Sequence, residues 1–324
     1  MYFEYLNVLN VSLIVVFLIL CICCWITFSG VKNMPGVLRY DEEKFYLDVP
    51  TDIRKLFPHL EDNPSVFLSV IIPAYNEENR LPTMLEECLE YLECRTKSNT
   101  DFSYELIIVD DGSSDNTTEV ALNFARKYST EKIRVLTLKK NRGKGGAVRL
   151  GMLSCRGRYL LFADADGATK FSDIEKLEKE MQVAVTENIN SIVIGSRAHL
   201  EKQAIASRSL FRTILMYGFH FLVWFFGVRS IRDTQCGFKM FTREAARILF
   251  PVLHVERWAF DVELLYIAEK RGMIIKEVAV NWTEIEGSKL VPFWSWLQMG
   301  IDLGLIWLKY QTRIWKVDDS KKTT

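Results

Sequence analysis

The residues Leu160-Leu161-Phe162-Ala163-Asp164-Ala165-Asp166-Gly167-Ala168 decide the fold of this chain. They form an apolar run that ends in two carboxylates separated by one small residue. If the run is a buried strand, side-chain alternation places Asp164 and Asp166 on one side of the chain where the strand stops. Two such carboxylates suit Mg²⁺ or Mn²⁺, which are held by few protein oxygens and complete their shells with water and substrate phosphates. The alternative is a strand that runs into an ordinary Asp-Gly turn.

Strands and helices alternate along the chain around this stretch. Apolar β-rich runs predict strands over 67–73, 104–109, 133–138, 159–163, 191–195 and 274–280. Helical patterns lie between or beside them, over 81–94, 116–128, from the 141–146 loop to about 155, over 173–186 and from the 258–263 segment to about 271. Such alternation predicts an α/β fold with a mostly parallel central sheet flanked by helices. In these sheets ligands bind outside the carboxyl ends of the strands, where the polar loops of this chain lie.

The composition is that of a globular protein. The 324 residues are 49% hydrophobic and 25% charged, and they include only 17 Gly and 8 Pro, which argues against a disordered or low-complexity chain. The 41 basic and 41 acidic residues cancel, so the charge gives no reason to expect nucleic acid as a partner. The seven cysteines are odd in number and lack zinc spacing, which favours reduced thiols in a domain that faces the cytosol.

The N-terminal region contains a long apolar run without charged residues, from Tyr5 to Val31. Its core, Val8 to Phe28, is long enough to cross a bilayer as a helix. A cleaved signal peptide is the alternative, but the run is too long, no basic region precedes it and no Ala-x-Ala site follows it. We therefore expect an uncleaved N-terminal transmembrane helix. The flanking charges are Glu4 before the run and Lys32, Arg39 and Lys44 after it, which places the N-terminus outside and the rest of the chain in the cytosol.

Carboxylates follow several of the expected strands. Glu77 follows the first strand, Asp110 and Asp111 follow the second, and Asp164 and Asp166 follow the fourth. So much negative charge at one edge requires cations or hydroxyl-rich ligands, such as a nucleotide with a divalent ion between its phosphates.

A glycine-rich turn that opens a helix offers a place for phosphate. Lys144, Gly145 and Gly146 supply free N–H groups and a positive charge. The turn is not a Walker A loop, and no Gly-x-Gly-x-x-Gly follows the first strand, so a dinucleotide cofactor is not expected. There is no Ser-His-Asp or Cys-His pattern, and the four histidines are too scattered for a zinc cluster.

Three motifs in order identify a family. Val70-Ile71-Ile72-Pro73-Ala74-Tyr75-Asn76-Glu77, Val109-Asp110-Asp111-Gly112-Ser113 and Asp164-Ala165-Asp166-Gly167 resemble the family 2 glycosyltransferases of GT-A fold. Each motif stands at the end of an expected strand, and the resemblance covers roughly 66–290. It implies a nucleotide-diphospho-sugar transferase in which the central sheet carries the donor site.

Later motifs resemble the polyprenyl-phosphate sugar transferases within that family. They are Gly195-Ser196-Arg197, Asp233-Thr234-Gln235-Cys236-Gly237-Phe238-Lys239 and Glu286-Gly287-Ser288-Lys289. A single N-terminal anchor, with the Trp-rich stretch from Asn281 to Trp296, is most similar to the eukaryotic group that transfers glucose from UDP-glucose to dolichyl phosphate at the cytosolic face of the endoplasmic reticulum membrane. The resemblance implies inversion, a Mg²⁺ or Mn²⁺ cofactor, and a product that donates glucose to lipid-linked oligosaccharides for protein N-glycosylation.

The resemblance also implies roles for individual residues. Asp110 and Asp111 hold the uridine and its ribose, beside a loop with Pro73, Tyr75 and Glu77. The metal ligands are Asp164 and Asp166, and the catalytic candidates are Asp166, Asp261 and Arg197. Related enzymes that use hydroxyl acceptors carry an acid near the position of Asp261, which suggests a general base. The alternatives are that Asp261 binds sugar hydroxyls or caps its helix. The further candidates for substrate contact are Lys144, Ala165, Arg197, Arg232, Gln235, Ser288 and Lys289; for Arg197, Arg232 and Lys289 the alternative is a surface ion pair.

The expected organisation follows from these assignments. Residues 1–31 are a lumenal stub and transmembrane anchor, 32–64 a loosely packed linker, 65–290 the GT-A domain and 291–324 an aromatic membrane-proximal segment. Leu215 to Val228 is too short to span a bilayer comfortably and is either a core helix or one that dips into the membrane. Pro292 to Tyr310 carries three Trp and is either an interfacial helix or an ordinary docking helix.

Three rival functions share parts of this pattern. A dolichyl-phosphate mannosyltransferase that uses GDP-mannose would have the same sheet motifs. A processive polysaccharide synthase needs several membrane spans, whereas this chain has one convincing candidate. A non-enzymatic scaffold on the same fold should have lost the acidic motifs, which are all present here.

Overall fold

The computed structural model describes residues 12, 14–18, 21, 38–200, 218, 228, 230–285 and 292–317. The strands are β1 Phe45–Asp48, β2 Ile53–Leu56, β3 Val66–Ala74, β4 Tyr104–Asp110, β5 Ile133–Thr137, β6 Gly157–Ala163, β7 Ser191–Ser196, β8 Phe238–Thr242 and β9 Ile274–Ala279. The α-helices are α2 Leu81–Ser98, α3 Thr117–Tyr128, α4 Lys144–Met152, α5 Ile174–Glu187, α8 Arg243–Leu249, α9 Phe260–Lys270 and α10 Pro292–Gln311. Short 3₁₀ helices are η1 Asp41–Lys44, η2 Phe171–Asp173, η3 Ala198–Leu200 and η4 Phe250–Val252.

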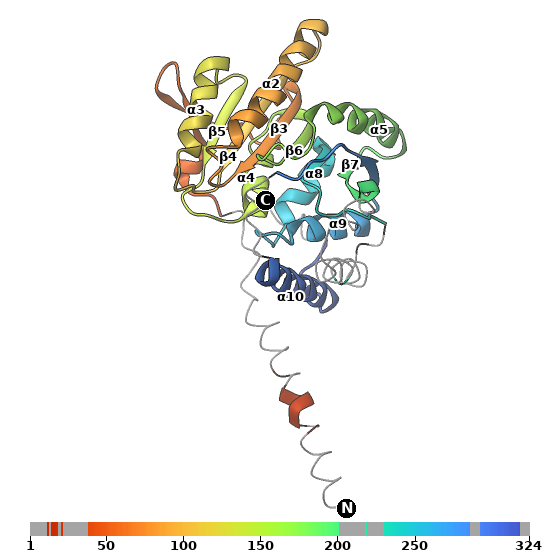
Figure 1. The fold of residues 1–324 in the computed structure, drawn as a ribbon. Coiled ribbons are helices and arrows are strands. Elements are labelled where there is room, and N and C mark those ends of the chain that lie inside the picture. Colours follow the sequence, from red (N-terminus) through yellow and green to blue (C-terminus); the bar gives the residue numbers. More distant parts are fainter. Residues whose placement is uncertain are drawn as a thin grey trace, which may run out of the picture.

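Seven of the described strands form one mixed sheet in the order β5-β4-β3-β6-β8-β7-β9 (Figure 1). All neighbouring pairs are parallel except β6–β8 and β7–β8, because β8 runs antiparallel to both of its neighbours. The expectation of a mostly parallel sheet is confirmed. The chain leaves β3 to build one side of the sheet through β4 and β5, and returns to its other side at β6. Ligands bind at such a switch point in doubly wound sheets.

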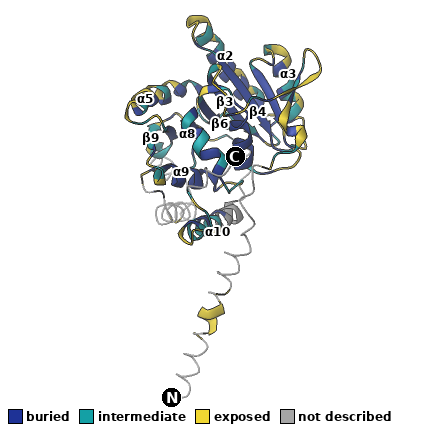
Figure 2. Ribbon diagram, turned by 180° about the vertical axis from the view of Figure 1, so that it is seen from behind, coloured by how far each residue is buried: buried dark blue, intermediate teal, exposed yellow. Residues whose placement is uncertain are grey.

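Helices cover both faces of the sheet because successive side chains point to opposite faces. On β3, Val70 and Ile72 belong to one buried cluster with residues of α2, α3 and α5, whereas Ile71 belongs to a second cluster with residues of α4, α8, α9 and α10. In Figure 2 the central strands β3, β4 and β6 are mostly buried and the edge strand β9 is intermediate, while the outward faces of α2, α3 and α5 carry exposed residues. Burial on both faces explains why the strand sequences are continuous apolar runs rather than alternating patterns.

The expected strands and helices are present, with ends that differ by a few residues. β8 and α8 were not predicted, because the run Phe238-Lys239-Met240-Phe241-Thr242 contains a lysine and follows a polar motif. Within β8 the side chain of Lys239 is fully buried, so the strand lies in the interior despite its charge. The buried charge of Lys239 is tolerated because the Asp261 carboxylate lies 2.6 Å from its ammonium.

The segment expected to be a loose linker is ordered and packed over residues 38–64. It forms η1 and the β1–β2 hairpin, which pairs Phe45 with Leu56. Tyr46, Phe57 and Leu60 are buried in the main core, and the Leu60 N–H donates to the carbonyl of Leu153 at 3.2 Å. The expectation of loose packing is therefore wrong for these residues, because apolar side chains between the charges anchor them.

Of the segments expected at the membrane, the structure describes 292–310 and only a few residues of the other two. Most of Val8–Phe28 and of Leu215–Val228 lies outside the described residues. Within the part of the chain that the structure describes, no helix combines the length and the apolar character that crossing a membrane requires. The helix expected over 292–310 is present as α10, and its residues Leu303, Ile306 and Tyr310 pack into the core. This packing agrees with a docking role for its inner face.

One buried arginine joins three separate segments. The Arg243 guanidinium at the start of α8 donates to the carbonyls of His59 at 3.1 Å, Asp62 at 3.1 Å, Cys155 at 3.4 Å and Gly157 at 2.9 Å. These carbonyls belong to the segment before β3 and to the start of β6. The interaction therefore holds the ordered N-terminal segment against the sheet.

We predict that Arg243→Met destabilises the fold by about 3 kcal/mol, because it leaves several buried carbonyls without a donor. Thermal or chemical unfolding measures the effect. The matched control is Arg158→Met, which removes an exposed arginine from β6 and should change stability by less than about 0.5 kcal/mol. Equal effects of the two substitutions would contradict the assignment.

Candidate active site

The charged loops meet at the carboxyl edge of the sheet, around the switch point between β3 and β6. Glu77 follows β3, Asp110 ends β4, and Asp164 follows β6. Asp261, in the first turn of α9, comes to the same edge from the face that α4 and α9 cover. The strand order thus brings together side chains that are up to 184 residues apart in the sequence.

The Asp111 carboxylate is held by the loop that precedes α4. Its Oδ1 accepts from the Arg142 N–H at 2.7 Å and its Oδ2 accepts from the Gly143 N–H at 2.8 Å. Gly143 has a φ of +82°, which places its N–H toward Asp111 at low steric cost. Burial raises the pKa of Asp111 to about 7, against the lowering effect of the two N–H donors.

The neighbouring Asp110 has a different environment. Its Oδ1 accepts from the Ser113 N–H at 2.9 Å, and its Oδ2 accepts from the Thr118 hydroxyl. Asp110 therefore orders the turn between β4 and α3. Both aspartates expected to bind the uridine lie at the expected edge. Asp110 accepts hydrogen bonds from the loop that leads to α3, and Asp111 accepts them from the loop that leads to α4.

A chain of alternating charges runs beneath the edge. The Lys144 ammonium at the start of α4 lies 2.5 Å from Asp164 Oδ1. The Lys239 ammonium on β8 lies 2.6 Å from Asp261 Oδ1 and also donates to the Cys236 carbonyl at 2.6 Å. Lys239 and Asp261 are almost completely buried, so each is the counter-ion that makes burial of the other tolerable.

These charges shift one another's pKa values. Burial lowers the pKa of Lys144, but the carboxylates of Asp164 and Asp261 more than offset this, so the pKa lies above its ordinary value. Burial raises the pKa of Asp261, and Lys239 and Lys144 oppose that rise. Lys144 therefore carries its positive charge throughout the physiological range, between two carboxylates.

Asp166 keeps a raised pKa although Arg80 and Lys144 act to lower it. Burial and the nearby charge of Asp164 raise its pKa, and its Oδ1 accepts only from the Ala168 N–H at 3.0 Å among the contacts described. Within the described residues no three His, Cys, Asp or Glu side chains assemble into a metal site. Asp164 and Asp166, the pair expected to bind a metal ion, stand at the end of β6 with Ala165 between them.

The loop after β3 also has its charge compensated. The Arg80 guanidinium forms two hydrogen bonds with the Glu77 carboxylate, at 2.6 and 2.7 Å. Pro73 lies within β3 and ends its apolar run, while the Tyr75 side chain is 40% exposed at the edge. Of the three loop residues expected beside the uridine, Tyr75 is thus the most exposed, Pro73 is half-buried and Glu77 is buried.

Arg197 is fixed by an acid from the later motif. Its guanidinium donates to both carboxylate oxygens of Asp233, at 2.7 and 2.8 Å, and its N–H donates to the same carboxylate. Arg197 holds the pKa of Asp233 below its usual range although burial acts in the opposite direction. The guanidinium also lies 5.4 Å from the centre of the Trp282 ring. Its position is therefore set before any substrate binds.

The other later candidates are distributed differently. Arg232 is exposed, and its N–H donates to Glu277 at 3.2 Å. The Gln235 Nε2 is buried and has no hydrogen-bond partner among the described residues, which leaves a donor for a ligand. Ala165 is buried between the two metal candidates. Ser288 and Lys289 lie outside the described residues.

Three residues of the site were not predicted from the sequence. Lys239 belongs to the 233–239 motif, which by itself gives the lysine no role, although a lysine inside an apolar run indicates that it needs a buried partner. Arg80 compensates Glu77 from the next turn of chain. Gly237 leaves room for Asp164, because a Cβ at that position would lie 1.9 Å from the carboxylate oxygen.

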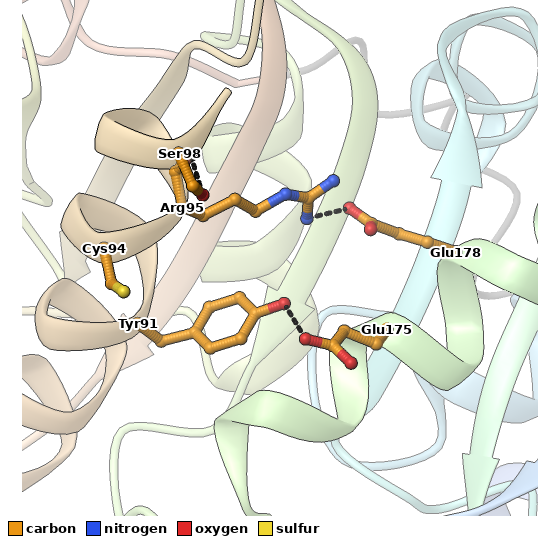
Figure 3. Close-up of a pocket in the computed structure, with 6 residues that line it drawn as sticks. All are labelled: Tyr91, Cys94, Arg95, Ser98, Glu175 and Glu178. Atoms are coloured by element: carbon orange, nitrogen blue, oxygen red, sulfur yellow. Dashed lines mark hydrogen bonds and ion pairs between the residues drawn. The ribbon is translucent and has the colours of Figure 1, made fainter. Parts of the chain in front are cut away.

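A hollow elsewhere on the surface does not belong to this site. Its volume is about 390 Å³. Figure 3 shows the residues that line it, which come from α2 and α5. Tyr91 donates to Glu175 at 2.9 Å and Arg95 to Glu178 at 2.7 Å, so two polar contacts bridge the helices there. None of the candidate site residues lines it, and the bridges give it a structural explanation.

Comparison with known proteins adds an independent finding. The sequence profile described as Glycosyl transferase family 2 matches residues 69–250. The chain is 61% identical over 292 residues to the dolichyl-phosphate beta-glucosyltransferase of Drosophila melanogaster, covering 90% of each chain. It is 58% identical to the Homo sapiens protein of the same name, covering 92% of each, and 42% identical to that of Saccharomyces cerevisiae, covering 87% of this chain and 88% of that one.

Among solved structures, the fold is similar to that of glucosyl-3-phosphoglycerate synthase from Mycobacterium tuberculosis. The crystal structure of its complex with Mn²⁺, UDP and glucosyl-3-phosphoglycerate aligns with a TM-score of 0.51 at 16% identity, covering 75% of this chain and 80% of that one. At this identity the likeness supports the fold and no residue assignment.

We predict that Asp111 makes stability fall as pH rises from about 4 to about 7. In this window the folded chain holds the Asp111 proton and the unfolded chain does not, so a higher pH favours unfolding, by up to about 4 kcal/mol in total. Asp111→Asn should remove this part of the pH dependence. Chemical unfolding at pH 5 and pH 8 measures it.

The control for this substitution is Asp101→Asn, which changes an exposed aspartate in the loop before β4. The pH dependence of this control should equal that of the unmodified chain. If Asp111→Asn also leaves the pH dependence unchanged, Asp111 does not titrate near neutrality.

Proposed function

We propose that this chain, which belongs to glycosyl transferase family 2 and within it to the dolichyl-phosphate beta-glucosyltransferases, transfers glucose to dolichyl phosphate. The glucose donor is UDP-glucose. The reaction inverts the anomeric centre and gives dolichyl β-D-glucosyl phosphate and UDP. This product is the glucose donor for lipid-linked oligosaccharide assembly in protein N-glycosylation. The observation that carries the proposal is an identity of 42–61% to proteins of this name over most of the chain.

The donor binds along the carboxyl edge between β4 and β6. Asp111, Asp110 and the exposed face of Tyr75 lie where the uridine half fits. Lys144 and the first N–H groups of α4 face the diphosphate, since a helix N-terminus and a lysine both favour anionic groups. The N–H of Gly146, which the sequence suggested would be free, donates to the Glu256 carbonyl at 2.8 Å and does not take part. Asp164 and Asp166 then lie at the sugar-phosphate end, after β6, which β3 separates from β4 in the sheet.

The donor set at this end fits a divalent metal ion, Mg²⁺ or Mn²⁺. Asp164 and Asp166 would hold it, since burial, and after it the charge of Asp164, raises the pKa of Asp166, and a bound cation would favour the ionised carboxylate. When bound, the ion stabilises the negative charge that develops on the departing UDP. The chain's own contribution is to keep both carboxylates at the end of β6, where Gly237 leaves the room that the Asp164 carboxylate needs.

Because the acceptor is a phosphate, the protein does not need to supply a general base. A phosphate monoester has a second pKa of about 6, so it is already mainly a dianion in the cytosol and attacks without a general base. Asp261 agrees with this, because it is buried and its carboxylate is engaged by Lys239. We therefore assign Asp261 a role in fixing the two lysines, and Arg197 and Gln235 roles in aligning the acceptor phosphate.

A membrane location follows from the acceptor. Dolichyl phosphate stays in the bilayer, so the edge of the sheet must lie close to the membrane surface. We propose a single-pass protein of the endoplasmic reticulum membrane, anchored by 8–28, with its catalytic domain in the cytosol. The uncharged N-terminal run and the basic residues after it support this orientation.

The test is sugar transfer to dolichyl phosphate by membranes that contain the full chain, with UDP-glucose and GDP-mannose supplied in parallel. We predict glucosyl-lipid from UDP-glucose, loss of the product with a chelator, and recovery with Mg²⁺ or Mn²⁺. Asp166→Asn should lower kcat at least about 100-fold, because one of two metal carboxylates is lost. Asp101→Asn serves as the matched control and should keep full activity.

Other results would redirect the assignment. Mannosyl-lipid from GDP-mannose would retain the fold and the acceptor but overturn the donor. Absence of any lipid product from intact protein would overturn the acceptor. Unchanged transfer after chelation would overturn the metal.

A second prediction concerns Lys144, whose ammonium occupies the same carboxylate that the metal would use. We expect Lys144→Met to tighten Mn²⁺ binding without nucleotide by roughly fivefold, because a competing cation worth about 1 kcal/mol is removed. The same substitution should slow glucosyl transfer, because a positive charge near the diphosphate is lost. Electron paramagnetic resonance titration with Mn²⁺ measures the affinity.

The control for this titration is Lys170→Met, which removes an exposed lysine from the loop after Asp166. It should leave the Mn²⁺ affinity unchanged. Weaker Mn²⁺ binding by Lys144→Met would show that the lysine supports the metal instead of competing with it.

A further inference from the structure

The segment between the expected anchor and the first strand reaches the active-site loop. Within this segment, Leu38 to Lys44, Glu43 has a completely buried side chain. The Arg142 guanidinium donates to both of its carboxylate oxygens, at 2.9 and 3.2 Å. The N–H groups of Lys139 and Tyr40 donate to the same carboxylate at 3.0 Å each. Four hydrogen bonds from three residues therefore converge on one buried charge.

This arrangement fixes Arg142 on all sides. Its guanidinium also donates to the carbonyl of Leu38 and lies 5.4 Å from the centre of the Tyr40 ring. A buried carboxylate or guanidinium without its partner is strongly disfavoured, so both segments must be in place together. The position of residues 38–44 and the position of the 139–142 loop are consequently linked.

The backbone of the same arginine acts on the donor site. The Arg142 N–H donates to Asp111 at 2.7 Å, and the next N–H, that of Gly143, donates to the second oxygen at 2.8 Å. Lys144 follows at once and contacts Asp164 at 2.5 Å. Three consecutive residues thus hold Glu43, Asp111 and Asp164, and a shift at the first is passed to the other two.

We propose that Glu43 is a positioning residue for nucleotide-sugar binding: by clamping Arg142 it holds the loop that presents N–H groups to Asp111 and the ammonium to Asp164. This inference rests on the function proposed above. It makes the segment that leads to the membrane a part of the donor site, although Glu43 itself touches no substrate. A second buried glutamate allows a comparison.

Glu105 on β4 is equally buried and is bonded to Arg134 at 2.7 Å and to Ser69 at 2.5 Å. It lies at the start of β4, at the end of the sheet opposite to the carboxylates. Loss of its charge should therefore weaken the fold without moving the donor loop. Glu105→Gln is the matched structural control for Glu43→Gln.

The experiment uses the full chain in membranes and measures glucosyl transfer at saturating dolichyl phosphate while UDP-glucose is varied, together with the midpoint of thermal unfolding. We expect Glu43→Gln to raise the KM for UDP-glucose about tenfold and to change the KM for dolichyl phosphate less than about twofold. Glu105→Gln should lower the unfolding midpoint and leave the KM for UDP-glucose within about twofold of its original value.

A double variant, Glu43→Met with Arg142→Met, removes both charges and so avoids an unpaired buried one. It supplies the same measurement if Glu43→Gln does not fold, and it should also show the raised KM. A folded variant with the original KM for UDP-glucose, or an equal rise in Glu105→Gln, would overturn the proposal. Failure of both Glu43 variants to fold would make the pair a folding requirement and would overturn it as well.

The unmodified chain separates this proposal from the proposed function. If it forms no glucosyl-lipid from UDP-glucose, the function fails regardless of the variants. If it is active and Glu43→Gln behaves like Glu105→Gln, the clamp alone fails.

Discussion

The constraint on which this structure depends is that carboxylates cannot be crowded at a buried sheet edge without cations beside them. Asp164, Asp166 and Asp261 meet within one region, and burial raises the pKa of both Asp166 and Asp261. Lys144 and Lys239 answer this charge from α4 and β8. Asp166 is the one of these three acids for which no ion pair is described, and it is one of the two carboxylates to which we assign the divalent ion.

The same constraint explains the mixed sheet. A lysine in the middle of a strand is costly unless a carboxylate reaches it, and the antiparallel β8 places Lys239 directly against Asp261 of α9. Because β8 runs antiparallel to β6, it begins beside the end of β6, where Ala163 pairs with Phe238. Lys239 therefore lies at the edge that carries Asp164 and Asp166. Fold and electrostatics therefore support each other in the second half of the domain.

Charge compensation also affects how the protein can catalyse transfer to a phosphate acceptor. A dianionic nucleophile requires alignment and positive potential, and it needs no group to remove a proton. An acid that is buried and bonded to a lysine suits such a reaction better than one that is free to act as a base. The ordered segment before β1 extends this organisation to the donor loop, because Glu43 and Arg142 form one more buried pair that is satisfied only when both segments are in place.

The sequence by itself determined the strand and helix alternation, the sheet class, and the strand-end placement of Glu77, Asp110, Asp111, Asp164 and Asp166, because these depend on local apolar runs and on the residues that stop them. It also identified the family from three ordered motifs. Only the tertiary structure decided that β8 is a strand, that Lys239 is the partner of Asp261, that Asp233 holds Arg197, and that Glu43 reaches Arg142 across 99 residues of sequence. The physical reason is that a buried charge is tolerated only through a specific partner, and the partner is chosen by the packing of distant segments, which no local pattern contains.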